Sequence, residues 1–203
     1  MRHYLTAILS LALLAFGPQV LSGQPPQELV RDTSTQMLTR LRQESKLIEQ
    51  TPERLYELVS EIVLPHFDFE LMGRWTLGKY WQRATPAQRD QFISEFRSLL
   101  VRKYGSALAE YVDEEIVYLP FTMSEKDTQV TVHTEINPVN GIPVNITYRL
   151  HHTDSGWKVY DVAIEGISLV TNYRTSFISK IRQDGLEQLI RQLAAINKGD
   201  GTT

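Results

Sequence analysis

"IPVNITYRLHH", residues 142–152, alternates between apolar and polar side chains along almost its whole length. This period of two is typical of a β-strand that packs one face on a core and leaves the other in solvent. The side chains predicted on the apolar face are Ile142, Val144, Ile146, Tyr148 and Leu150. Residues 127–136 repeat the pattern with Val130, Val132 and Ile136. The sequence therefore predicts paired strands that share one dry face.

Two further segments, residues 115–121 and 156–166, are also predicted to be strands. Turn-forming residues separate the four segments, at 124–126, 137–141 and 153–156. Consecutive strands joined by short turns pair as antiparallel neighbours. We expect a four-strand antiparallel meander.

Segments with helical periodicity lie on both sides of this meander, and most begin or end at residues that commonly cap helices. Before the meander, the first predicted helix spans residues 28–50, and the second runs from Thr51, its N-cap, to Leu64. A short third helix is capped by Asp68 and ends near Gly78. A fourth helix opens with the capping box Thr85–Pro86–Gln88. After it, they are residues 169–181 and 186–196, separated by Gly185. This order predicts an α+β fold with helices packed on the dry face of a curled, mainly antiparallel sheet.

The first 22 residues have the layout of a secretory signal peptide. A short basic start, residues 1–3, precedes an apolar run at 4–16 and small residues at 20–23. The run is shorter than the about 20 apolar residues that span a bilayer, although a retained membrane anchor is the alternative. We expect removal of residues 1–22 and a single mature α+β domain at 23–203, located in the bacterial periplasm.

Composition excludes several classes of function. The chain has no cysteine, so disulfides, thiol catalysis and a lipid-modified N-terminal cysteine are excluded. Its formal net charge is −3, which gives no electrostatic footprint for nucleic acid or for general adhesion to anionic membranes.

Motifs of catalysis and metal binding are also missing from the sequence. It contains no glycine-rich phosphate loop, no Gly-x-Ser-x-Gly and no His-Glu-x-x-His. If the hairpin turns at residue 139, His133 pairs with residue 145, which places His151 about 20 Å away along the sheet. Two histidines that far apart do not share a zinc ion. We expect no metal and no cofactor.

Asp161 is the carboxylate that attracts most interest, because Tyr160 and Val162 flank it within a predicted strand. It could serve as the general base of a small exported enzyme, or as a structural hydrogen-bond acceptor, since a buried carboxylate needs partners. The sequence favours the structural role. The acidic run Asp113–Glu115 is expected to be solvated.

The aromatic stretch "HFDFELMGRWTLGKYW", residues 66–81, predicts buried apolar surface. That surface could belong to an ordinary core, contact a partner protein, or bind an apolar ligand. Periodicity alone does not show whether the core is hollow.

Two blocks of sequence resemble the MlaC family, the periplasmic phospholipid carriers also called toluene-tolerance proteins. One is "LPHFDFELMGRWTLGKYWQRATPAQRDQFISEFRSLLVRKYG", residues 64–105. The more specific one is "GWKVYDVAIEGISLVTNYRTSFISKI", residues 156–181, in which a Trp-Lys-Val-Tyr-Asp-Val strand is followed by Glu-Gly-Ile-Ser-Leu and by Asn-Tyr-Arg at a helix start. The resemblance extends over about residues 30–193.

The resemblance implies a monomeric, non-enzymatic carrier that holds acyl chains between sheet and helices and leaves the headgroup outside. Its implied partners are phospholipid, an inner-membrane ABC transporter with a ring of MCE domains, and an outer-membrane lipoprotein–porin complex. With this role, the residues expected to line the cavity are Leu100, Tyr104, Val132, Ile146, Tyr148, Leu150, Val170, Tyr173 and Phe177. Arg174 is expected near the mouth, where it would meet a phosphate or form a surface salt bridge. Phe67, Phe69, Trp75 and Trp81 are assigned mainly to the core.

Two other functions remain possible from the residues alone. One is a periplasmic protein-interaction module with a solid core. The other is the small exported α+β enzyme that uses Asp161 with a nearby tyrosine.

Overall fold

Five antiparallel strands form one sheet in the order β1-β2-β3-β4-β5. The computed structural model describes residues 23–139 and 141–199, so the predicted signal peptide lies outside the described residues. The strands are β1 (Glu115–Tyr118), β2 (Gln129–Asn137), β3 (Val144–Thr153), β4 (Gly156–Ile164) and β5 (Ile167–Ser168). The first four are the predicted meander, and β5 is a short fifth strand that the sequence did not indicate.

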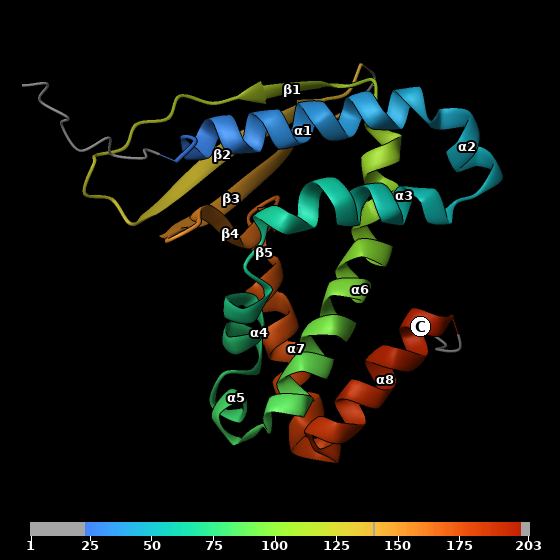
Figure 1. Cartoon of the computed structure of the whole chain (residues 1–203), viewed down its shortest axis with the longest axis vertical. Coiled ribbons are helices and arrows are strands. Elements are labelled where there is room, and N and C mark those ends of the chain that lie inside the picture. Colours follow the sequence, from blue (N-terminus) through green and yellow to red (C-terminus); the bar gives the residue numbers. More distant parts are fainter. Residues whose placement is uncertain (1–22, 140, 200–203) are drawn as a thin grey trace, which may run out of the picture.

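Helices precede and follow the sheet, as the sequence predicts (Figure 1). Those before it are α1 (Pro26–Gln43), α2 (Ser45–Gln50), α3 (Glu53–Leu58), the π-helix η1 (Val59–Val63), the 3₁₀-helix η2 (Leu64–His66), α4 (Phe69–Leu77), α5 (Lys79–Arg83) and α6 (Pro86–Glu110). Those after it are α7 (Leu169–Asp184) and α8 (Leu186–Lys198). In the part of the chain that the structure describes, no helix is both long enough and apolar enough to cross a bilayer.

The long helix α6 connects two layers of the molecule (Figure 1). One of its ends lies near the start of β1, where α1 runs alongside the sheet and contacts β2. Its other half packs with α4, and its contacts with α8 complete a helical layer that includes α7. The Thr85 capping box that starts α6 is present, with both reciprocal hydrogen bonds between Thr85 and Gln88.

The helical layer has a solid aromatic core. The rings of Phe92 and Phe96 stack at 5.6 Å between centroids, and Phe177 meets both of them edge-on at 5.8 Å. Tyr173 packs on Phe96 and Phe177 at 5.3 Å. Offset and edge-on pairs at such spacings are favourable beyond the apolar area that they bury.

The β2–β3 hairpin turns one residue later than the sequence analysis assumed. His133 lies opposite Thr147 and His151 lies opposite Gln129, so the two histidines are four positions apart along the sheet, or about 13 Å. The estimate of 20 Å was therefore too long. Among the described residues, no group of three or more His, Cys, Asp or Glu side chains is placed to hold a metal ion.

Two helix predictions are corrected in detail. The helix predicted over 28–50 is broken at Glu44, whose φ of −106° lies outside the helical range and whose carboxylate faces two arginines. Thr51 does not cap the next helix with its side chain; Pro52 occupies the N-cap position instead. Asp68, in contrast, caps α4 as predicted, with its carboxylate accepting from the Leu71 N–H at 2.8 Å.

The turn between β4 and β5 explains the unpredicted fifth strand. Glu165 and Gly166 both have positive φ, 49° and 76°, which is the backbone of a two-residue type I′ hairpin turn. The Glu165 carboxylate accepts a hydrogen bond from the Asn145 N–H at the start of β3. The two-residue turn reverses the direction of the chain, so Ile167 pairs with Ile164.

Candidate functional site

Strand register places a continuous apolar floor on the dry face of the sheet. Residues opposite one another on antiparallel strands point to the same face. Ile116 lies opposite Ile136, which lies opposite Val144 on β3. In the next row, Ile146 lies opposite Ile164. All five side chains line one cavity.

Helices α1 and α6 and the π-helix η1 form the walls of this cavity, with η2 and α4 at one side. Its volume is about 410 Å³, within the range of about 300–1,000 Å³ that is usual for small-molecule sites. The walls contain Leu29, Val30, Thr33, Ser34, Met37, Leu38, Val59, Val63, Leu64, His66, Phe67, Phe69, Met72, Leu100, Val101, Tyr104, Gly105, Ala107, Leu108 and Tyr111. Thr134, Tyr148, Val159, Val162 and Leu169 complete the lining.

The cavity has almost no electrostatic features at neutral pH. No Asp, Glu, Lys or Arg is among the described residues that line it. Burial raises the pKa of Tyr148 to about 12, so this phenol stays neutral. Burial, assisted by the charge of Lys158, lowers the pKa of His66 and favours its neutral form. Such a lining suits an apolar ligand, because an unpaired charge would be costly to bury there.

The model of the MlaC protein family matches residues 31–195, which is most of the chain. The chain belongs to the MlaC family. The resemblance found in the two sequence blocks is thereby confirmed.

Similar proteins match this MlaC family member over most of its length. The toluene tolerance protein ttg2D of Pseudomonas putida is 26% identical over 174 residues, which cover 85% of this chain and 80% of that protein. The intermembrane phospholipid transport system binding protein MlaC of Haemophilus influenzae is 24% identical over 191 residues, 92% of this chain and 89% of that protein. A phospholipid-binding protein from Ralstonia solanacearum, solved in complex with a phospholipid, has a TM-score of 0.81 at 30% identity and covers 88% of this chain and 100% of its own.

Four of the predicted site residues lie on the cavity wall of this MlaC family member. Leu100 and Tyr104 come from α6, and Ile146 and Tyr148 come from β3. The strand alternation and the α6 periodicity thus identify part of the wall. Whether these side chains contact lipid stays a prediction.

The remaining predicted site residues lie outside the lining. Five are buried in the solid core: Val132, Leu150, Val170, Tyr173 and Phe177. They share the apolar faces of their strands and helices, but they belong to the packed core cluster. Arg174 is exposed on α7 and its guanidinium lies beside Gly78, so the structure does not place it at the cavity.

The aromatic stretch contributes to the cavity more than the sequence suggested. Phe67 and Phe69, assigned mainly to the core, do pack in the core cluster, and they also line the wall together with His66 and Met72. A bridge between Phe67 and Val159 and a 2.8 Å hydrogen bond from the Asp68 N–H to the Val159 carbonyl hold this segment on β4. The expectation for Trp81 is met, whereas Trp75 is partly exposed and packs edge-on against Tyr160.

Sequence reasoning missed the contribution of α1 and η1 altogether. The sequence predicts a helix over residues 28–50, and two apolar side chains of that segment, Met37 and Leu38, line the cavity. The amphipathic pattern was the available signal, but it does not tell which surface the stripe faces. Val59 and Val63 lie in a π-helix, a rare element that is often found at functional sites.

Asp161 lies on the sheet face opposite the cavity. It is paired across the strands with Arg149, whereas the cavity residues Tyr148 and Val162 are opposite one another in the adjacent position. Its carboxylate accepts from the Ser168 hydroxyl at 2.6 Å and from the Val170 N–H at 3.1 Å. It therefore anchors the start of α7, and its hydrogen-bonding capacity is used for structure.

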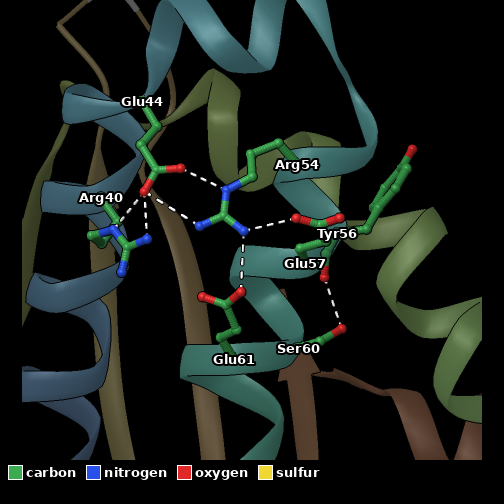
Figure 2. Close-up of polar contacts among 7 residues, drawn as sticks. All are labelled: Arg40, Glu44, Arg54, Tyr56, Glu57, Ser60 and Glu61. Carbon is green, nitrogen blue, oxygen red and sulfur yellow. Dashed lines mark hydrogen bonds and ion pairs between the residues drawn. The ribbon is translucent and has the colours of Figure 1, made fainter.

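An ionic cluster ties the end of the α1 wall to α3 (Figure 2). Arg54 pairs with Glu44 at 2.6 Å, with Glu57 at 2.8 Å and with Glu61 at 3.1 Å. Glu44 also accepts from Arg40 of α1 at 2.6 Å. Hydrogen bonds from Arg54, then from Arg40, hold the pKa of Glu44 below its ordinary value. We call these five residues the Arg54 cluster.

Removal of the Arg54 guanidinium from this cluster should make the thermal stability of the protein less dependent on pH. A carboxylate with a lowered pKa stabilises the fold above its ordinary pKa of 4.5, and this contribution is lost as pH falls through the lower, folded-state value. Arg54→Leu should therefore lower the melting temperature at pH 7 and flatten its decline below about pH 4.5. Circular dichroism melts over pH and salt measure this.

The matched control is Arg191→Leu, which removes an exposed pair with Glu187 on α8. Exposed helical pairs contribute little, so that variant should melt like the wild type at every pH. Equal pH profiles for wild type and Arg54→Leu would show that the Arg54 cluster does not stabilise the wall.

Proposed function

We propose that this protein is a soluble periplasmic carrier that moves phospholipid between the outer and inner membranes and so maintains outer-membrane lipid asymmetry. The observation that carries the proposal is the apolar cavity of about 410 Å³ between the sheet, α1, η1 and α6. Its support is that the chain belongs to the MlaC family and that the Ralstonia solanacearum protein of the same fold is solved with a phospholipid.

A carrier is needed because acyl chains are costly to expose to water. Each methylene removed from water contributes roughly 0.8 kcal/mol, so a tail of about sixteen carbons costs on the order of 12 kcal/mol to expose. Passage across an aqueous gap without a carrier would therefore be rare. A cavity lined by sheet and helix side chains supplies the apolar surroundings that the tail needs.

The same cavity suits a carrier that accepts several headgroups. Charged side chains are lacking among the described lining residues, so the walls offer no ion pair to a phosphate. The headgroup would stay at the surface in water while the acyl chains lie inside. Affinity then comes mainly from chain burial, which differs little between phospholipid classes.

The proposed partners are an inner-membrane ABC transporter with a ring of MCE domains and an outer-membrane lipoprotein–porin complex. The name of the Haemophilus influenzae relative, a binding protein of an intermembrane phospholipid transport system, supports this assignment. We propose that the carrier is a monomer that visits each partner in turn.

Neither rival function fits the residues as well. An interaction module with a solid core would have no use for the cavity. The enzyme hypothesis needs a free Asp161, but this side chain is 1% exposed and bonded to Ser168 and Val170 on the face away from the cavity. We propose that the protein has no catalytic activity.

The decisive experiment compares the native and denatured masses of the chain from Gly23 onward, purified from a bacterial periplasm without detergent. The carrier should hold phospholipid near stoichiometrically, and extraction should identify it. An empty protein that also fails to take up lipid from vesicles would contradict the proposal and favour the interaction module.

A further inference from the structure

Three large apolar side chains are exposed at one end of the sheet. Val139 and Ile142, in the β2–β3 hairpin, are each 85% exposed, and Ile167 of β5 is 62% exposed. The prediction that Ile142 belongs to the dry face of β3 is thus wrong. The strand starts at Val144, after Pro143, which has no N–H to donate to a ladder.

These side chains continue the cavity lining to the outside of the molecule. Ile136 and Val144, opposite one another at the base of the hairpin, both line the cavity. Ile167 lies opposite the lining residue Ile164 and shares its face. The apolar side chains of the cavity floor are therefore followed, at this end of the sheet, by exposed apolar side chains.

Two carboxylates lie beside this exposed apolar surface. Glu114 accepts from the Val139 N–H at 2.9 Å, and Glu165 accepts from the Asn145 N–H. Glu115 lies opposite Asn137 and Glu135 lies opposite Asn145, so these two carboxylates are at the same end of the sheet but on its other face.

Basic residues are sparse around the same surface. Between Lys103 and Arg149 the sequence has a single Lys or Arg, Lys126, which precedes β2 and so lies toward the opposite end of the sheet. Arg42 of α1 approaches from the side and pairs with Asp113 at 3.4 Å. This end of the sheet is therefore apolar at its centre and acidic around it.

We infer that this surface, the hairpin face formed by Val139, Ile142, Ile167, Glu114 and Glu165, docks a protein that presents an apolar depression bordered by Lys and Arg. The acidic border would steer a basic partner into place, and burial of the apolar centre would hold it. An anionic membrane surface is a poor match, because it would repel the same carboxylates.

Docking at the hairpin face would allow lipid to pass between the two proteins, and this step rests on the proposed carrier function. A partner seated there covers the edge at which the cavity lining reaches the surface. An acyl chain could then pass between the two proteins along apolar side chains, with little exposure to water. The hairpin face would thus serve as the contact through which lipid is exchanged.

The double variant Val139→Asp/Ile142→Asp tests the inference with the full mature chain. The probes are the purified periplasmic domain of the MCE-domain protein and the purified outer-membrane lipoprotein complex of the same organism, with binding measured by surface plasmon resonance. The variant should bind at least one probe about tenfold or more weakly, because truncation of an interface centre has effects of this size. Its melting temperature and lipid occupancy should equal those of the wild type, since both positions are solvent-exposed.

Two further variants sharpen the test. Glu114→Lys/Glu165→Lys should slow association and reverse its salt dependence, as expected for electrostatic steering. Ile196→Asp, on the exposed side of α8, is the matched control and should bind like the wild type.

Three outcomes would overturn the inference. The first is unchanged partner binding by the double variant. The second is loss of binding to vesicles that contain phosphatidylglycerol while partner binding persists, which would identify a membrane contact instead. The third is a wild type that binds neither probe. Native-mass lipid occupancy is measured separately, so failure of docking is distinguishable from failure of the carrier proposal.

Discussion

Replacing Ile146 by tryptophan should empty the cavity of lipid while the protein stays folded. Ile146 points from β3 into the cavity floor beside Ile164 on β4. An indole at this position fills space that acyl carbons would otherwise occupy. If it displaces about three methylenes, binding weakens by about 2.4 kcal/mol, or roughly 50-fold in Kd.

The fold should tolerate this change because the new ring enters open space. Overpacking of a filled core costs about 1–3 kcal/mol, whereas a cavity accepts added atoms without displacing neighbours. Native mass spectrometry measures occupancy, and a thermal melt measures stability. Asn145→Trp is the matched control, because residue 145 is exposed on the opposite face of the same strand. Wild-type occupancy in Ile146→Trp would place the ligand elsewhere.

Strand alternation predicted the sheet and its dry face correctly, because a side chain's face is fixed by its position along a single strand. Ile146 and Tyr148 were found on the cavity wall for this reason. Val132 and Leu150 share that face but lie under helices in the solid core. Which part of a face is covered depends on distant elements, and a period of two contains no information about them.

The hollow itself could not be predicted from periodicity. Leu100, on the cavity wall, and Phe96, in the solid core, belong to the same apolar side of α6, four residues apart. The difference arises because α7 packs the rings of Tyr173 and Phe177 against Phe96, whereas Leu100 borders the cavity that α1 and η1 also line. Only the family resemblance pointed to a cavity, and it could not supply the residues of α1.

Helix starts were predictable where a nearby side chain caps the helix. Asp68 and the Thr85 capping box start helices as expected, because each side chain satisfies free N–H groups at its own helix end. The break at Glu44 was not predictable, since it accompanies an ion pair with Arg54, ten residues later. The fifth strand was missed because glutamate rarely occupies the positive φ of 49° found at Glu165.

Replacing Asp161 by alanine should cause a large loss of stability with no direct effect on the cavity. The carboxylate is 1% exposed and bonds the Ser168 hydroxyl, the Val170 N–H and the Arg149 guanidinium, the last at 3.2 Å. Hydrogen bonds to a buried charge contribute about 1.5–3 kcal/mol, and loss of bonding at a helix start costs about 1 kcal/mol.

The expected loss is about 3 kcal/mol, less than the larger cost of breaking a fully buried ion pair. Arg149 is 44% exposed, so its charge can remain in water when Asp161 is removed. Urea denaturation measures the free energy of unfolding, and Asp154→Ala, in the exposed β3–β4 turn, is the matched control with little expected effect.

Asp161→Asn should lose less stability than Asp161→Ala, because an amide oxygen still accepts from the Val170 N–H. Lipid occupancy below the melting temperature should be that of the wild type, because Asp161 faces away from the cavity. A stable Asp161→Asn protein that had lost turnover of some substrate would instead revive the enzyme hypothesis.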